Sequence, residues 1–92
     1  LLYRSPEGLV VVDYKTSASS DPSDLDRRVE AYRDQGASYA LSVGRATREP
    51  VARVTFVLLT PDGARERNLA QLDLAIAHVR ELVASGREVL VS

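Results

Sequence analysis

Two charged residues, Asp13 and Lys15, are the part of this sequence best suited to chemistry. They follow the apolar run of residues 9–12, whose β-branched side chains predict a buried strand. Because side chains alternate along a strand, Asp13 and Lys15 should share one face, with Val12 and Tyr14 on the other. A carboxylate beside an ammonium can hold a divalent cation and stabilise negative charge on a phosphoryl oxygen. The pair therefore predicts phosphodiester chemistry, with a surface ion pair at a strand end as the ordinary alternative.

The next segment of the chain has helical periodicity over residues 23–43. Tyr32, Gln35 and Tyr39 lie on it at spacings of three and four, so one side of the helix carries an amide between two phenols. A face used only for packing would not need the glutamine. The ordinary alternative is two half-buried tyrosines whose hydroxyls reach water, with Gln35 at the boundary.

Together, these features resemble the nuclease domain of the PD-(D/E)XK superfamily, in its RecB-like branch. The strand of residues 8–16 and the helix bearing Gln35 and Tyr39 carry the resemblance. Within that branch the chain is most similar to the C-terminal nuclease domain of AddA-type or UvrD-like helicase-nucleases. The resemblance implies that Asp13 binds a metal ion, that Lys15 is the active-site lysine, and that Gln35 and Tyr39 lie against the DNA and the active site.

The resemblance also implies a metal cofactor with a ligand upstream of this sequence. Mg²⁺ or Mn²⁺ would be held by Asp13, by the Tyr14 carbonyl and by an acid on the preceding strand. Leu1 to Tyr3 look like the tail of that strand, so the earlier acid is expected just before Leu1. Residues 4–8 predict a tight turn, so the two strands should form a hairpin with that acid across from Asp13.

The implied function is metal-dependent cleavage of DNA by an exonuclease domain of an ATP-dependent helicase-nuclease that repairs double-strand breaks. Its partners would be DNA, the helicase domains of the same chain and a second helicase-nuclease subunit. The implied fold is α/β, a restriction-endonuclease-like mixed sheet flanked by two helices, with residues 1–92 as a single partial domain. Two alternatives stay open: a nuclease-like domain without activity that guides DNA or has a structural role, and an ordinary interaction domain.

Composition sets bounds on these expectations. Zero cysteines fit a reducing cytosol and exclude a cysteine-held iron–sulfur cluster within the 92 residues. No stretch reaches the length of a membrane span, so a cytoplasmic protein without membrane partners is expected. A net charge of −1 counts against an autonomous nucleic-acid binder, although tethering to a motor domain would replace intrinsic affinity. Arg45, Arg48 and Arg53 cluster after the first helix, where they suit a phosphate backbone or a solvated loop.

The ends of the first helix can be predicted from capping residues. Ser23 is expected to be its N-cap, with Asp26 completing a pattern like a capping box. The helix should end near Val43, with Gly44 at the C-terminal position that glycine favours.

The second half of the sequence predicts two strands and a helix. Residues 51–60 are apolar on both faces and suit the middle of a covered sheet. A turn at residues 61–63 leads into a charged edge strand over residues 64–69, and a helix follows over residues 71–84. The expected buried stripe of that helix is Leu72, Ala75, Ile76, Val79, Leu82 and Val83. His78 lies outside this stripe and is expected to be an exposed or boundary residue, without a functional role.

Overall fold

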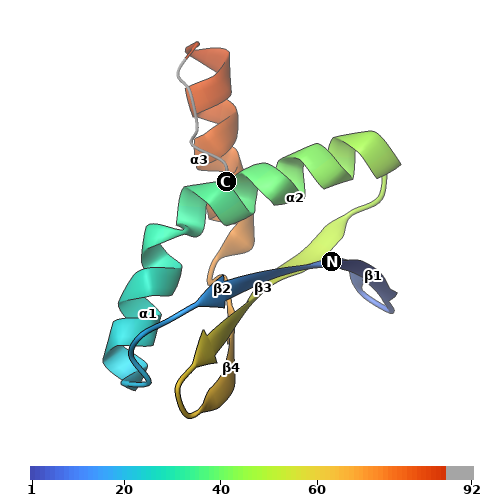
Figure 1. The fold of residues 1–92 in the computed structure, drawn as a ribbon. Helices are drawn as coiled ribbons and strands as arrows, with labels where there is room; N and C mark the ends of the chain where they lie inside the picture. Colours follow the sequence, from blue (N-terminus) through green and yellow to red (C-terminus); the bar gives the residue numbers. More distant parts are fainter. Residues whose placement is uncertain (87–92) are drawn as a thin grey trace.

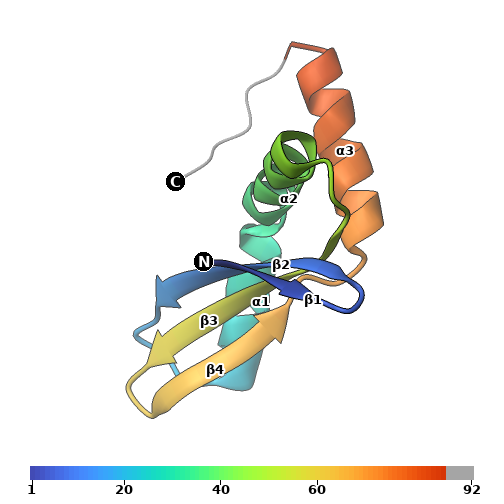
Figure 2. The same ribbon diagram turned by 90° about the vertical axis from the view of Figure 1, so that its right-hand side faces the viewer.

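The computed structural model describes residues 1–86 and shows in them a four-stranded sheet with three helices on one side (Figure 1, Figure 2). In chain order the elements are β1 (Leu2–Ser5), β2 (Gly8–Thr16), α1 (Pro22–Ala31), α2 (Arg33–Thr47), β3 (Val51–Thr60), β4 (Gly63–Asn68) and α3 (Leu72–Ala84). The strands lie in the order β1-β2-β3-β4; β2 and β3 are parallel, and the two outer pairs are antiparallel. The mixed α/β architecture predicted from the sequence is confirmed, with the strand of Asp13 inside the sheet.

The hairpin at the start of the chain forms as predicted. β1 pairs antiparallel with β2, and Leu1 and Val12 exchange two backbone hydrogen bonds of 2.9 and 2.7 Å. Gly8 follows the turn at φ 140°, where an added Cβ would lie 2.7 Å from the Pro50 carbonyl oxygen. Only glycine fits this conformation and this space. The same residue therefore makes the turn and lets β2 approach the start of β3.

The segment predicted as one helix over residues 23–43 is two helices that meet at Tyr32. α1 ends at Ala31, Tyr32 leaves helical geometry (φ −91°, ψ 7°), and α2 begins at Arg33. The apolar periodicity continues through the break, so the sequence pattern does not reveal it. The two helices expected around the sheet are therefore three, and α1 and α2 meet at a clear angle (Figure 1).

Both caps of this helical pair also differ from the prediction. Asp21 is the N-cap of α1 in place of Ser23, because Pro22 already occupies the first helical position and the Asp21 carboxylate accepts the Ser23 N–H at 2.9 Å. α2 continues past Gly44, and the residue that ends it is Arg48, which has the left-handed conformation (φ 57°) usually taken by glycine.

The three helices bury one face of the sheet around Phe56 of β3. This side chain is fully buried, and its ring lies 5.8 Å from the Tyr32 ring. Gly36 of α2 comes so close that an added Cβ would lie 3.0 Å from Phe56 Cζ. The opposite face has a smaller apolar cluster of Val10, Val12 and Val57, and no described helix crosses it. The expectation that β3 is covered on both faces therefore holds for one face only within residues 1–86.

The second half of the chain follows the prediction closely. β3 has the expected bounds, and β4 is the edge strand. α3 packs mainly on α2, with Leu72, Ala75 and Val79 buried. Val83 is 50% exposed, so the predicted stripe is wrong there, because the C-terminal end of α3 extends beyond α2 (Figure 1, Figure 2). No helix among the described residues is long and apolar enough to cross a bilayer.

Candidate active site

Asp13 and Lys15 lie side by side near the C-terminal end of β2, on the face that the helices cover. Asp13 Oδ2 is 3.5 Å from Lys15 Nζ, and the two side chains are only 20% and 16% exposed. They share this face with Val11, which belongs to the main core. Because water screens such a pair poorly, their mutual attraction exceeds that of a solvated surface pair. Both side chains are half-buried, so the pair is less solvated than an ion pair on an open surface.

The Lys15 ammonium also contacts an aromatic ring. Lys15 Nζ lies 4.8 Å from the centroid of the Tyr32 ring, within the range of a cation–π interaction. Arg28 Nη2 donates to the Tyr32 hydroxyl at 3.3 Å and to the Thr16 carbonyl at 2.8 Å. The break between α1 and α2 thus places the Tyr32 ring against Lys15, a contact that the sequence pattern did not reveal. Lys15 is held between a carboxylate and a braced ring.

One oxygen of Asp13 has no hydrogen-bond donor among the described residues. Oδ2 is buried and accepts no hydrogen bond there, and its contact with Lys15 is an ion pair at 3.5 Å. A buried carboxylate oxygen without a donor costs free energy, and a bound cation would compensate for this cost. This oxygen therefore fits the role of a metal ligand.

A cavity of about 470 Å³ opens beside Asp13, between the start of the chain, β2 and α2. Its lining comprises Leu1, Leu2, Val11, Val12, Asp13, Tyr39 and Val43. Tyr39 is half-buried, and Gln35 lies one turn earlier on the same side of α2 with 7% of its surface exposed. The structure therefore brings Asp13 and Tyr39 to one cavity. Lys15 lies next to this cavity because it is ion-paired with Asp13, and Gln35 lies near it because it precedes Tyr39 by one turn of α2.

Tyr14 has its side chain on the opposite face of the sheet. That side chain is 54% exposed, so only the backbone of Tyr14 is oriented to join the site. Val12 directs both its N–H and its carbonyl toward Leu1. Tyr14 follows two residues later, so its carbonyl points toward the same side of β2, away from β3. An oxygen in this position is compatible with the metal contact expected of the Tyr14 carbonyl.

The described residues supply only part of a metal site. Within residues 1–86, no group of three or more His, Cys, Asp and Glu side chains is close enough together to hold a metal ion. Asp13 is the one carboxylate in the cavity lining. Mg²⁺ commonly takes one or two carboxylates and keeps several waters. The Asp13 carboxylate and the Tyr14 carbonyl therefore fit this ion as an incomplete ligand set. In the β1–β2 register, the position before Leu1 falls opposite Asp13.

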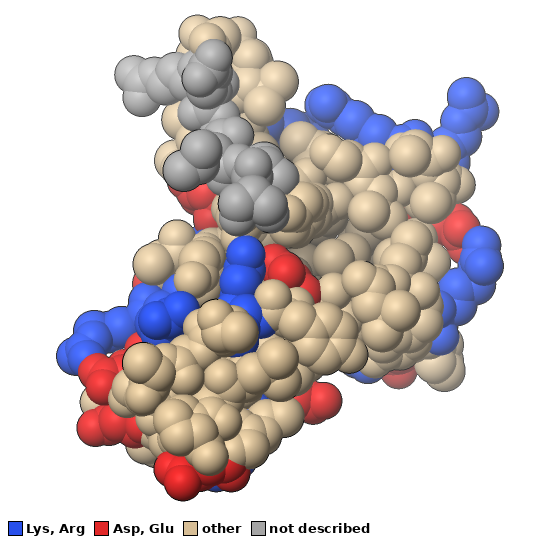
Figure 3. Space-filling view, in the orientation of Figure 1, with Lys and Arg blue, Asp and Glu red and all other residues tan. Residues whose placement is uncertain are grey.

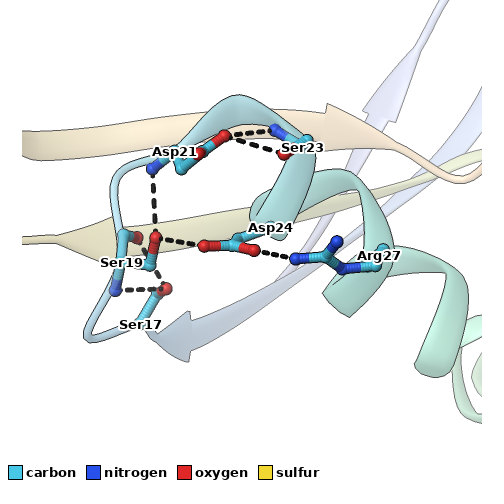
Figure 4. A network of polar contacts seen from close by, with 6 residues as sticks. All are labelled: Ser17, Ser19, Asp21, Ser23, Asp24 and Arg27. Carbon is cyan, nitrogen blue, oxygen red and sulfur yellow. Dashed lines mark hydrogen bonds and ion pairs between the residues drawn. The ribbon is translucent and has the colours of Figure 1, made fainter.

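The loop after β2 is ordered by hydrogen bonds between short polar side chains (Figure 4). Ser19 Oγ donates to Asp24 at 2.8 Å and accepts the Asp21 N–H at 3.1 Å. Ser23 donates both its hydroxyl and its N–H to Asp21, each at 2.9 Å, which holds the pKa of the Asp21 carboxyl below its usual value. The loop thus fixes the start of α1 relative to the end of β2, and with it the helix that leads to Tyr32.

Composition contains a signal that the motif search missed. Lys15 is the only lysine in the chain, beside eleven arginines. An ammonium is a compact, strongly hydrated point charge, whereas a guanidinium is a broad planar fork. Lys15 therefore presents a kind of cation that no other Lys or Arg position of the chain presents. His78, by contrast, is exposed as predicted, with Nε2 3.8 Å from Asp34.

No family model, curated protein or solved structure matches this chain. The family assignment accordingly remains the resemblance carried by the strand of Asp13 and Lys15 and by the helix of Gln35 and Tyr39.

Proposed function

We propose that this chain is a metal-dependent DNA nuclease domain of restriction-endonuclease-like fold. The single observation that carries the proposal is the buried Asp13 oxygen, which has no hydrogen-bond donor among residues 1–86 and lies 3.5 Å from the only lysine of the chain. A carboxylate oxygen that accepts no hydrogen bond, beside an ammonium with little exposure to water, suits hydrolysis of a phosphodiester, in which negative charge grows on the phosphoryl oxygens.

In the proposed mechanism each site residue has one role. Asp13 and the Tyr14 carbonyl would hold Mg²⁺ or Mn²⁺, and the ion would supply Lewis-acid polarisation of the phosphate and a more acidic water. Lys15 donates hydrogen bonds to a phosphoryl oxygen or to the attacking water. Because the Lys15 side chain has little exposure to water, its attraction to the negative charge of the phosphate is stronger. Tyr39 orients the DNA strand at the cavity that it lines, and the buried Gln35, one turn earlier on α2, supports the same side of the site.

The topology supports the same fold assignment. A hairpin leads into β2, a helical crossover follows, and β3 returns parallel to β2. A second acid, as the family resemblance implies, would lie opposite Asp13 if the hairpin register were continued past Leu1. We further propose that the domain works in the cytoplasm within a longer helicase-nuclease, whose helicase domains deliver the DNA. Such tethering compensates for the chain's net charge of −1.

The alternative is a nuclease-like domain that guides DNA without cutting it. The observation that favours it is the ion pair itself, because an Asp13 carboxylate satisfied by Lys15 is a stable arrangement that requires no metal. In this case the fold is kept and the second acid is absent.

Cleavage of end-labelled DNA distinguishes the two functions. The natural polypeptide that contains these residues is incubated with single-stranded and duplex DNA in Mg²⁺ or Mn²⁺, beside Lys15→Ala and Lys15→Arg variants. A matched control is Arg53→Ala, which removes a positive charge from the opposite face of the sheet. We expect both Lys15 variants to lose cleavage by about a hundredfold or more, with the control unchanged. If no protein cuts while all bind DNA, the guide function is correct; if none cuts or binds, both are wrong.

A further inference from the structure

Three arginines without a partner line one groove at the C-terminal end of α2. Arg45 and Arg48 come from the end of α2, and Arg80 comes from α3. Within residues 1–86, each of these three side chains makes neither a hydrogen bond nor an ion pair. Every other described arginine makes at least one such contact; these are Arg4, Arg27, Arg28, Arg33, Arg53, Arg65 and Arg67. Figure 3 shows basic side chains projecting at the upper right, where α2 ends.

Arg45, Arg48 and Arg53, which are close in sequence, therefore do not all lie together in the structure. Arg53 leaves the cluster, because it lies on the opposite face of the sheet and donates to the Tyr3 hydroxyl at 3.4 Å. Arg80 joins it from a helix that begins many residues later. A solvated loop, which was the ordinary explanation for the sequence cluster, does not account for a basic residue brought in by a second helix.

The positive charge of the groove is not compensated by its own lining. Glu49 is the one acid that lines it, and this carboxylate already accepts two hydrogen bonds from Arg4, at 3.0 and 2.8 Å. The C-terminal end of α2 adds a partial negative charge of about one half, which favours a basic residue nearby. That partial charge is small beside three guanidinium groups. The groove therefore remains strongly cationic.

Arg48 has a backbone conformation that arginine rarely adopts. Its φ of 57° and ψ of 26° lie in the left-handed region, where a residue without a Cβ is free of strain. Glycine would end the helix here more easily. An arginine kept in a strained conformation at the rim of a cationic groove indicates that its side chain has a function.

The shape of the groove suits a sugar–phosphate backbone. It has a volume of about 360 Å³, and its lining includes the apolar side chains of Leu41, Val51 and Ile76 between the arginines. Guanidinium groups bind phosphate oxygens in a planar, bidentate manner, and apolar side chains can support the sugar. At 1.5 Å per helical residue, Arg45 and Arg48 lie about 9 and 14 Å beyond Tyr39 along α2, a distance of a few nucleotides.

We propose that Arg45, Arg48 and Arg80 form a groove that binds the phosphate backbone of a nucleic acid strand a few nucleotides from the bond to be cut. The identity of the strand as the nuclease substrate rests on the proposed function. The binding of nucleic acid by the groove does not, so the two proposals can fail separately.

Binding to fluorescein-labelled single-stranded DNA, in EDTA to prevent cleavage, tests the groove. Anisotropy is measured over a series of salt concentrations for the chain of residues 1–92. The triple variant Arg45→Gln, Arg48→Gly, Arg80→Gln is compared with Arg27→Gln, Arg53→Gln, Arg65→Gln, which removes the same charge elsewhere. We expect the groove variant to bind on the order of tenfold more weakly. Its slope of log affinity against log salt should fall by about 2, as for three lost phosphate contacts. Equal affinity in the two triple variants would overturn the proposal.

Two further measurements separate the groove from damage to the fold and from the active site. Arg48→Gly should weaken binding severalfold without lowering the melting temperature, because glycine relieves the strain at φ 57°. A lower melting temperature would show that Arg48 has a structural role. Arg65→Gln, on β4 and outside both the groove and the active site, should bind as the wild type does. Weaker binding by the groove variant together with no cleavage by the wild type would contradict only the nuclease, because the binding test in EDTA does not require cleavage. Inorganic pyrophosphate is the probe for small anions: if it displaces DNA at the concentration at which it binds alone, with no gain from chain length, the groove is a site for small anions and the assignment to a nucleic acid backbone is wrong.

Discussion

The two faces of the sheet are built from the same two central strands but place very different side chains in very different surroundings. On the covered face, β2 carries Val11 into the main core and then presents Asp13 and Lys15 where that core ends. On the opposite face it carries Val12 and then Tyr14, which is 54% exposed. The comparison shows how a small domain buries an ion pair without interrupting its core: the pair takes the last positions of the strand, and the alternation keeps the apolar residues before it.

The largest contrast between the faces should appear in chemistry. Asp13→Asn removes a half-buried charge from the covered face while keeping the size of the side chain, and Glu66→Gln likewise replaces a carboxylate by an amide at an exposed position on the opposite face. We expect Asp13→Asn to abolish tight Mg²⁺ or Mn²⁺ binding and to lower cleavage by about a hundredfold or more. Glu66→Gln should alter neither. Calorimetric titration measures the binding of Mn²⁺, and labelled DNA measures cleavage. Equal losses of binding and cleavage in the two variants would show that the active site is not confined to the covered face.

The next contrast is in stability. Phe56 and Val57 are neighbours on β3 that point to opposite faces, and both are buried. Phe56→Ala should lower the free energy of unfolding by about 3–5 kcal/mol, because it opens a cavity among the helices. Val57→Ala should cost about 1 kcal/mol. Urea denaturation followed by circular dichroism measures both values. A cost for Val57→Ala as large as that for Phe56→Ala would mean that the opposite face is covered in solution.

How closely α2 approaches the covered face can be tested at two glycines of this helix. A Cβ at Gly36 would lie 3.0 Å from Phe56 Cζ, whereas one at Gly44 would meet no atom closer than 3.6 Å. Gly36→Ala should therefore destabilise the protein by about 1–3 kcal/mol through overpacking. Gly44→Ala should stabilise it by about 0.5–1 kcal/mol, as usual for a glycine inside a helix. If both changes stabilise the protein, α2 lies farther from the sheet than this structure has it.

The contrast between the faces was predictable from the sequence only in part. Alternation correctly placed Asp13 with Lys15, and Tyr14 opposite them, because the period of a strand leaves no choice once its core residues are known. Which face the helices cover was not predictable, since β3 is apolar on both faces. The covering depends on close approaches, such as that of Gly36 to Phe56, which have no signature in a single sequence.

The break at Tyr32 and the arginine groove escaped prediction for related physical reasons. Helical periodicity runs through Tyr32 unchanged, because the same residues face the core on both sides of the bend. The groove joins Arg45 and Arg48 to Arg80 through the packing of α3 on α2, and sequence spacing carries no information on that packing. Asp21, and not Ser23, is the helix cap because Pro22 decides where the helix begins, and this signal is present in the sequence.

The smallest expected effect concerns the loop that joins β2 to the helices of the covered face. Asp21 accepts the Ser23 hydroxyl and N–H, which lower its pKa below the usual value of 3.8. A carboxyl group with a lower pKa in the folded state stabilises the protein above its unfolded pKa, and this contribution is lost as the pH falls through the folded value. Asp21→Asn keeps the capping acceptor but has no charge to titrate. We therefore expect the wild type to melt slightly above Asp21→Asn at pH 7, with the difference shrinking as the pH falls below the usual value of 3.8 and through the lower pKa of the folded state. A difference that persists at low pH would mean that the geometry of the cap, and not the charge, holds the start of α1.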